Sequence, residues 1–270
     1  MILTFPSTFK AEFRVLKGAE ISEMANRPDV SSSESIGHLL RSTWVKTVDP
    51  GPYAWESGGD GKPSVLGADG ALLAAPQCDK MLSGDLIFGL LWHAIESVPR
   101  GELYKFPVQC ERTHPKRQYD WSINLKSQLL ERGDEFGGSA VRYLSHETVE
   151  HMRARGNRFE TTVAGRKAVY KLQSPSDERP IADLRKIVKK FTPAEIVAVQ
   201  LIEIEGIGKS VRDRWEFTKN LDGPDLYTLF EEVQGKDCGI ETGISTRCPE
   251  CEWEQEVDLP FGRLFSPRRH

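Results

Sequence analysis

Apolar residues follow two different periods along the chain, and they predict both strands and helices. Residues 9–15 alternate between apolar and polar, as in a strand with one buried face. Residues 35–47 place apolar side chains at helical spacing, and residues 86–97 do so within an almost wholly apolar segment. We therefore expect an N-terminal strand, then one helix, and then a helix buried in the core.

Two hairpins are expected in the middle of the chain. Residues 101–125 alternate on both sides of a central turn, and residues 159–172 alternate around Gly165 and Arg166. Residues 49–80 are rich in Gly, Pro and Asp, which predicts a long loop before the core helix.

The C-terminal half is expected to begin with helices and to end with strands. Thr192, Pro193 and Glu195 form the capping box of one helix. Apolar spacing predicts helices over residues 183–191, 193–204, from 211 onward and 223–235. Strand patterns return at residues 240–246 and 252–259.

Together these elements predict an α+β fold, in which zinc-ribbon-like β-hairpin knuckles combine with a helical segment in the C-terminal half. We expect three parts. Residues 1–80 hold the N-terminal strand, the helix and the long loop, and residues 81–175 hold the core helix, the first knuckle and a β segment. Residues 176–270 hold the helical segment, the second knuckle hairpin and a tail.

Composition narrows the class of protein. With 270 residues, of which 39% are hydrophobic and 28% charged, the chain is typical of globular proteins with a real core. A net charge of −4 opposes a whole-molecule electrostatic grip on nucleic acid, which is therefore not the expected partner. No apolar run approaches the ~18 residues of a membrane span, and residues 1–7 do not resemble a signal peptide. We expect a protein of the cytoplasm with no membrane partner.

The cysteines indicate a metal site. Their odd number, five, suits metal ligation better than a disulfide framework. Cys248 and Cys251 have C-x2-C spacing at the tip of the expected C-terminal hairpin, where both thiolates would face one ion. Cys110 and His114 occupy the corresponding turn of the first hairpin, and each turn is followed by a tryptophan, a β-branched residue, Asn or Asp, and leucine. Two such half-sites would complete one tetrahedral structural zinc site.

Two positions leave the ligand set open. His114 is equally well explained as an exposed turn histidine before Pro115. Cys238 precedes Cys248 by ten residues and is an alternative fourth ligand, or else a buried thiol at a helix exit. A closed four-ligand site would be structural, because catalytic zinc keeps one position for water. Such a site would contribute directly to the free energy of folding.

Short blocks of the sequence resemble a family of tailed-phage proteins. The blocks are Leu82–Phe88, Gly101–Cys110, Trp121–Leu125, Asp237–Thr242, Cys248–Cys251, Val257–Phe261 and Leu264–Pro267. In this order they are similar to the T-even-type baseplate hub and hub-assembly (chaperone) proteins, which carry cysteine knuckles after a Gly-Asp helix and before a terminal tail. The chain departs from the family at His114, where the family has a paired cysteine, and at Glu252-Trp253, where it often has glycine.

The resemblance implies a structural or assembly protein rather than an enzyme. It implies a place in the virion tail, assembly in the host cytoplasm, and other baseplate, hub and tail proteins as partners. The long loop and the tail (residues 260–270) are the expected contact arms, since assembly proteins often order such segments on binding. The chain also lacks Gly-x-Ser-x-Gly, His-Glu-x-x-His and EF-hand motifs, so no active site is expected.

A DNA-binding zinc-ribbon protein is the alternative function. Gly206, Ile207, Gly208 and Lys209 match the turn of a helix-hairpin-helix, after an apolar helix expected to end at Ile204. Amides at the start of the next helix would then meet a DNA phosphate. A glycine-rich connection between two packed helices explains the same residues, and the acidic composition favours it.

Overall fold

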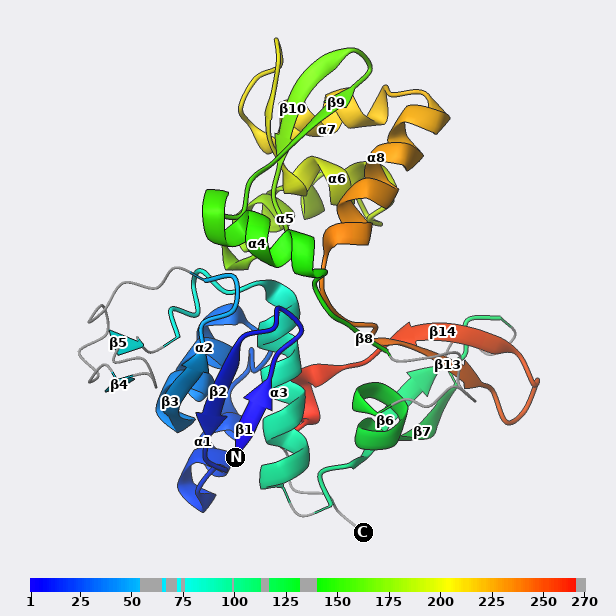
Figure 1. Cartoon of the computed structure of the whole chain (residues 1–270). Coiled ribbons are helices and arrows are strands. Elements are labelled where there is room, and N and C mark those ends of the chain that lie inside the picture. Colours follow the sequence, from blue (N-terminus) through cyan, green and yellow to red (C-terminus); the bar gives the residue numbers. More distant parts are fainter. Residues whose placement is uncertain are drawn as a thin grey trace.

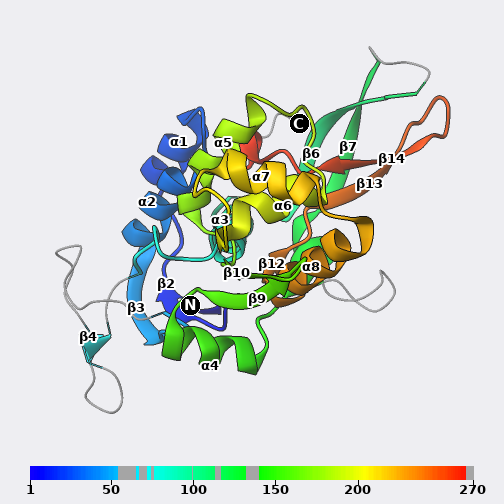
Figure 2. The same ribbon diagram turned by 90° about the horizontal axis from the view of Figure 1, so that it is seen from above.

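The computed structural model describes residues 1–53, 65–66, 72–73, 76–98, 100–112, 117–131 and 140–265, with the backbone alone at 65–66, 72–73 and 263. Over these residues the fold is mixed α+β, with helices and several small antiparallel sheets. The α+β class expected from the sequence is therefore confirmed. Figure 1 shows an upper lobe that contains α4 to α8, above an N-terminal layer and two long hairpins. Seen from above in Figure 2, the hairpins and the N-terminal layer lie on opposite sides of the upper lobe.

The N-terminal layer packs helices against a three-stranded antiparallel sheet. The strand order is β1-β2-β3, with β1 at Ile2–Thr4, β2 at Lys10–Phe13 and β3 at Trp44–Asp49. The helices are α1 (Gly18–Asn26), α2 (Ser33–Thr43) and α3 (Ser83–Ser97). Phe9, Ala11 and Phe13 are buried, which agrees with the alternation in the sequence.

The helix expected over residues 35–47 is wrong at its C-terminal end. α2 ends at Thr43, and Trp44 begins β3, which pairs with β2. Pairing with β2 thus overrides the helical spacing. The long loop contains the short strands β4 (Val65–Leu66) and β5 (Leu72–Leu73), and most of its other residues lie outside the described part of the chain.

The apolar helix α3 lies in the centre of the core, as expected, and its first turn carries a buried carboxylate. Asp85 accepts hydrogen bonds from the Ser7 amide (2.9 Å), the Ser7 hydroxyl and the Tyr53 hydroxyl (2.6 Å). Burial raises the pKa of Asp85 to about 6, although these hydrogen bonds act in the opposite direction. The network joins the N-terminal strand segment to α3.

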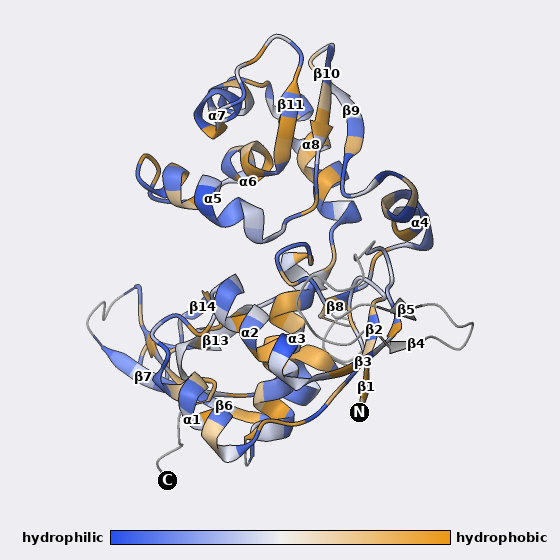
Figure 3. Cartoon of the chain, turned by 90° about the vertical axis from the view of Figure 1, so that its left-hand side faces the viewer, coloured by the Kyte–Doolittle hydropathy of each residue, from blue (hydrophilic) through white to orange (hydrophobic). Residues whose placement is uncertain are grey.

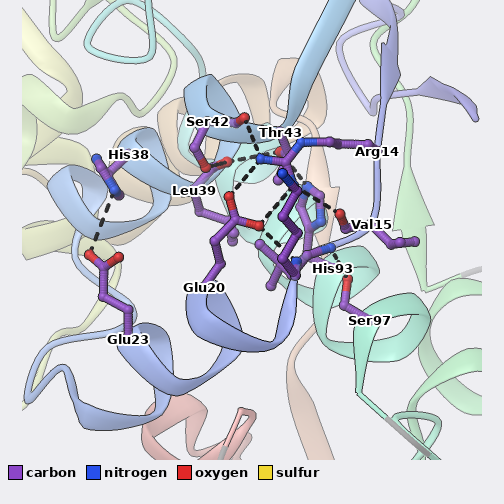
Figure 4. Close-up of polar contacts among 12 residues, drawn as sticks. Arg14, Val15, Glu20, Glu23, His38, Leu39, Ser42, Thr43, His93 and Ser97 are labelled. Carbon is purple, nitrogen blue, oxygen red and sulfur yellow. Dashed lines mark hydrogen bonds and ion pairs between the residues drawn. The ribbon is translucent and has the colours of Figure 1, made fainter.

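Arg14 joins the end of the N-terminal sheet to α1 and α2 (Figure 4). Its guanidinium donates two hydrogen bonds to Glu20, of 2.8 and 2.6 Å, and one of 3.0 Å to the Ser42 carbonyl. The bonds from Arg14 are the main reason that the pKa of Glu20 falls to about 2. Beside this pair, a nitrogen of the His93 ring lies 3.0 Å from the Thr43 hydroxyl. Burial lowers the pKa of His93 to about 3, so its ring is neutral.

Two long hairpins extend from the N-terminal layer, as expected from the sequence. β6 (Leu103–Gln109) pairs with β7 (Gln118–Asn124), and β13 (Gly243–Arg247) pairs with β14 (Glu254–Asp258), both antiparallel. Alternate side chains of β6 are buried, and the hydroxyl of one of them, Tyr104, donates to the carbonyl of Pro260, which follows β14. Short helical turns follow each hairpin: a π-helix at Lys126–Leu130 and a 3₁₀ turn at Phe261–Arg263.

The upper lobe contains a second antiparallel sheet, with strand order β11-β10-β9. In Figure 3, β9 forms the outer margin of this sheet. The elements in chain order are α4 (His146–Arg155), β9 (Phe159–Val163), β10 (Arg166–Tyr170), a 3₁₀ turn (Pro175–Asp177), α5 (Glu178–Arg185), α6 (Pro193–Gln200), β11 (Leu201–Ile204), α7 (Val211–Lys219) and α8 (Gly223–Lys236).

Two helix boundaries expected in this lobe are wrong. The basic helix expected over residues 183–191 is α5, which ends at Arg185. The residues after it pack Val188 and Phe191 against a small apolar cluster without continuing the helix. The apolar run expected to be helical up to Ile204 changes at Leu201 into β11, which pairs with β10.

The upper lobe is joined to the rest of the chain by two neighbouring strands. β8 (Val141–Arg142) leads into the lobe and β12 (Gly239–Ile240) leads out of it, and the two strands pair with each other. The first turn of α3 packs on the second connection. A Cβ atom at Gly84 would lie 2.1 Å from the Cys238 carbonyl oxygen, so only glycine fits there.

Candidate metal centre

Three cysteines from the tips of the two hairpins lie together. Cys110 follows the last residue of β6, and Cys248 and Cys251 belong to the turn between β13 and β14. Their sulfur atoms all lie within 4.8 Å of one another, and the Cys110 and Cys251 sulfurs are 3.6 Å apart. The cluster therefore joins segments that are separated by 141 residues in the sequence.

Backbone hydrogen bonds close both turns around the sulfurs. The Cys110 amide donates to the Arg117 carbonyl (3.1 Å), and the Cys248 amide donates to the Trp253 carbonyl (2.9 Å). Hydrogen bonds from the amides of Cys251 and Glu250 lower the pKa of the Cys248 thiol, whereas burial and the two neighbouring thiols raise it, and the net direction is upward. Amides directed at a sulfur in this way are the outer-shell contacts that stabilise a thiolate once a metal is bound.

Gln255 connects the two turns from within β14. Its side-chain amide donates to the Gln109 carbonyl (2.7 Å), and its side-chain oxygen accepts from the Glu111 amide (3.1 Å). The carboxamide thereby binds the backbone on both sides of Cys110. A further bond of 3.1 Å between the hydroxyls of Tyr119 and Thr246 joins the same hairpins. These contacts hold the relative position of the cysteines without any ion.

The three sulfurs fit the dimensions of a zinc site. Zinc–sulfur bonds of ~2.3 Å in a tetrahedron place two sulfurs roughly 3.8 Å apart. The measured 3.6 Å between Cys110 and Cys251 is close to this value. Cys110 and Cys248 are buried and Cys251 is half-buried, which is the environment of a structural ion. Thiolate ligands also select zinc over hard cations such as magnesium and calcium.

Charged side chains surround the cluster in pairs. Arg117 of the first turn forms an ion pair with Glu250 of the second. Arg247 pairs with Glu252 at 2.9 Å, and the Arg112 guanidinium lies 4.5 Å from the centre of the Trp253 ring. The Arg117–Glu250 and Arg112–Trp253 contacts connect the two hairpins, so they add to the link made by the cysteines.

The structure places the expected ligands as follows. It brings three of them, Cys110, Cys248 and Cys251, into one cluster. His114 lies outside the described residues, so its ligation stays a prediction. Cys238, the alternative ligand, is not in the cluster; it is buried near Asp85, and burial raises the pKa of its thiol.

The Gly206–Lys209 turn of the DNA-binding alternative lies between different elements from those expected. β11, a strand, precedes Gly206, whereas a helix was expected there. The start of α7 is already capped, because the Ser210 hydroxyl accepts from the Asp213 amide (3.1 Å). The Asp213 carboxylate lies against Gly208, within 2.3 Å of where a Cβ atom would be. A carboxylate therefore fills the position that a phosphate would take beside Gly208 and Lys209.

Two contributors to the centre were not identified from the sequence. Gln255 is one of them, and the Tyr119–Thr246 hydroxyl pair is the other. A buried polar side chain on an amphipathic strand is the signal that Gln255 offers, but its two partners lie 144 and 146 residues away in the sequence. Nothing in the local sequence identifies such distant partners.

The fold and the site thus define a mixed α+β protein with a three-cysteine cluster between two hairpins. Comparison with protein-family models, curated proteins and solved structures found no match for the chain. Among the described residues, every helix is too short or too polar to cross a lipid bilayer.

Proposed function

We propose that this protein is a zinc-stapled structural or assembly component of a tailed-phage baseplate or hub, and not an enzyme. The observation that carries the proposal is the convergence of Cys110, Cys248 and Cys251 at the tips of two hairpins. One ion held by these thiolates and a fourth ligand would fix two distant chain segments relative to each other. The place in a phage tail rests on the sequence blocks that resemble the hub family.

The surroundings of the cluster favour a structural ion over a catalytic one. Catalytic zinc needs an open position and a general base close to the bound water. Here Glu250 and Glu252, which lie in the turn of the second hairpin, are both paired with arginines. The nitrogen and the oxygen of the Gln255 carboxamide are both hydrogen-bonded to backbone groups on either side of Cys110. His114, four residues after Cys110, is the proposed fourth ligand, and it would close the site.

Metal content tests the zinc part of the proposal. Purified wild-type protein should contain one zinc per chain by inductively coupled plasma mass spectrometry. Cys110→Ser and Cys248→Ser should each lose it, because the two hairpins share one ion. Cys238→Ser is the matched control and should keep its zinc. His114→Ala should lower zinc affinity if His114 is the fourth ligand. A wild-type protein without metal would end the zinc proposal.

A genetic experiment tests the role in tail assembly. Deleting the gene from the phage that encodes it should leave particles that lack functional tails by electron microscopy. Wild-type protein supplied from a plasmid should restore infectivity, whereas Cys248→Ser should not. A truncation that lacks residues 261–270 tests the terminal contact arm. Normal tails and normal infectivity in the deletion phage would refute the assembly role whatever the metal content.

The DNA-binding alternative keeps a direct test. Phosphate contacts weaken steeply with salt, so duplex binding that falls between low and high salt would support it. Lys209→Ala should then reduce the affinity. The absence of binding at low salt would remove the alternative. The carboxylate of Asp213 beside Gly208 is the structural reason to expect this second result.

A further inference from the structure

The outer strand of the upper-lobe sheet has an edge that pairs with no other strand among the described residues. β9 is the last strand in the order β11-β10-β9, and Figure 3 shows it at the margin of the lobe. β9 and β10 are joined by the two residues Ala164 and Gly165, both in the left-handed region (φ 48° and 73°), as in a type I′ hairpin. The register of this turn determines which backbone groups of β9 point outward.

Glu160 and Thr162 direct their backbone groups away from the sheet. In a two-residue hairpin the residues that flank the turn, Val163 and Arg166, form a hydrogen-bonded pair, and pairs then alternate along the strands. Thr162 and Glu160 are therefore in non-hydrogen-bonded positions. A hydrogen bond of β10 supports this assignment. Lys167, which lies opposite Thr162, directs its carbonyl away from β9 and accepts from the Glu205 amide (2.9 Å).

This edge is accessible, and its outward backbone groups have no hydrogen-bond partner in the described residues. Glu160 and Thr162 are both exposed. In the described part of the chain, no backbone hydrogen bond reaches the outward amides and carbonyls of these two residues. An exposed edge with free amides and carbonyls is a template for another strand. Two amides and two carbonyls in a row allow four hydrogen bonds to an added strand.

A basic hollow lies beside this edge, on the side of α4 and α8. Its volume is about 540 Å³, and His151, Arg155, Arg158, Phe159 and Lys236 are among the residues that line it, together with Glu147 and Glu160. Arg158 and Lys236 have carboxylate partners within the chain. Arg155 has no ion pair among the described residues. An acidic side chain on an added strand would supply one.

We propose that the β9 edge binds an extended segment of a partner protein by strand addition, with an acidic side chain of that segment directed at Arg155. The partner strand makes backbone hydrogen bonds with Glu160 and Thr162. Successive side chains of the added strand point to opposite faces of the sheet. Every second one faces the hollow that Phe159 helps to line, and the others lie beside Thr162. Strand addition draws its affinity from the backbone and its specificity from the alternate side-chain positions. This proposal rests on the β9 geometry and is independent of the metal centre.

Peptide binding to the full-length protein tests the proposal. The probe is a fluorescein-labelled nonapeptide that alternates valine and glutamate, and binding is measured by fluorescence anisotropy. Wild-type protein should bind it in a saturable manner, and the matched peptide with lysine in place of glutamate should bind more weakly. Arg155→Glu should reverse this order. Absence of binding, or equal binding of both peptides, would contradict the proposed partner.

Backbone recognition is tested on both molecules. Peptides N-methylated at alternate residues lose the amides of one edge only, so one of the two methylated peptides should bind roughly tenfold more weakly and the other should bind normally. Thr162→Pro removes an outward amide and should weaken binding to a similar extent, whereas Thr162→Val should not. The peptide pair needs no change in the protein, so a failure of Thr162→Pro to fold leaves the test intact. Equal binding of the two methylated peptides would exclude strand addition.

A second copy of the chain is the competing occupant of this edge. Analytical ultracentrifugation distinguishes it, because pairing of two β9 strands would give a dimer that dissociates in Thr162→Pro. A monomeric wild-type protein that binds the acidic peptide supports the proposal. A dimer that excludes the peptide would overturn it.

Discussion

At the scale of single residues, Asp85 links the stability of the fold to pH. Its carboxyl is wholly buried, and its pKa rises from 3.8 to about 6. Because the folded-state pKa is the higher one, ionisation is less favourable in the folded protein than in the unfolded chain. The contribution of Asp85 to stability is therefore largest when it is protonated, and it falls as the pH rises from about 4 through 6.

We predict that this dependence disappears in Asp85→Asn. The difference in unfolding free energy between wild type and variant should shrink by about 2 kcal/mol as the pH rises from 4.5 to 7.5, because most of the shift of about two pKa units is titrated in this range. Urea titrations at several pH values measure this difference, and groups common to both proteins cancel from it. At pH 4.5 wild type should be the more stable, because asparagine cannot accept all the hydrogen bonds of Ser7 and Tyr53. A difference that is constant with pH would show that Asp85 does not titrate in this range.

Glu252 has a strained backbone in the turn between β13 and β14. Its φ is +56°, a backbone conformation that favours glycine. We predict that Glu252→Gly raises the unfolding free energy by about 1 kcal/mol. Its ion pair with Arg247 is exposed on both sides and offsets little of this gain. Thermal denaturation of the purified variant and wild type measures the change.

Glu252→Ala is the matched control for this position. It removes the same ion pair and keeps the Cβ atom, so it should not be stabilised. If alanine and glycine gave equal stability, the left-handed backbone would not be the source of strain.

At the scale of elements, the contact between α3 and β12 depends on a missing side chain. We predict that Gly84→Ala destabilises the protein by about 3 kcal/mol, because a Cβ atom would overlap backbone atoms of Cys238 and Gly239. Gly235→Ala in α8 is the control, since nothing lies within 4 Å of its Cβ position. Alanine should stabilise α8 there by about 0.5–1 kcal/mol. Denaturant unfolding of both variants measures the contrast, and a tolerated Gly84→Ala would mean that α3 can move away from β12.

Elements with a strong local pattern could be predicted from the sequence. The helix α3, the hairpins β6–β7 and β13–β14, and the capping box at Thr192 all depend on residues close together in the chain. Failures occurred where pairing with a distant strand decided the outcome. Trp44 and Leu201 both leave helical segments to join sheets, although the apolar pattern continues without a break. An apolar run buried on all sides does not distinguish helix from strand.

The candidate site was predictable to the same extent. The C-x2-C spacing of Cys248 and Cys251 is local, and the similar turn at Cys110 suggested a shared ion. Gln255 could not be identified, because its two bonds cross to a hairpin far away in the sequence. Cys238 resembled a ligand in spacing alone, and the packing of β12 on α3 takes it elsewhere.

At the scale of the whole molecule, the chain has two separate ways of holding distant parts together. The hairpins meet at the cysteine cluster, whereas the upper lobe is joined through the paired strands β8 and β12. Polar contacts also connect this lobe to the N-terminal layer: Arg153 with Asp49 and the Gly51 carbonyl, and Glu178 with the Ser33 amide. None of these contacts involves the hairpin tips.

Removal of the proposed zinc ion should therefore loosen the hairpins and leave the upper lobe unchanged. We predict that a strong zinc chelator speeds amide hydrogen exchange in β6, β7, β13 and β14, because their tips lose the link between Cys110 and the second knuckle. Exchange in α6 and β10 should stay as it was. Mass spectrometry of exchanged peptides measures both regions in one experiment, and Cys110→Ser without chelator should reproduce the pattern. If exchange rose equally in the upper lobe, the ion would stabilise the molecule as one cooperative unit. If the hairpins did not respond, Gln255 and the Tyr119–Thr246 bond would be sufficient to hold them.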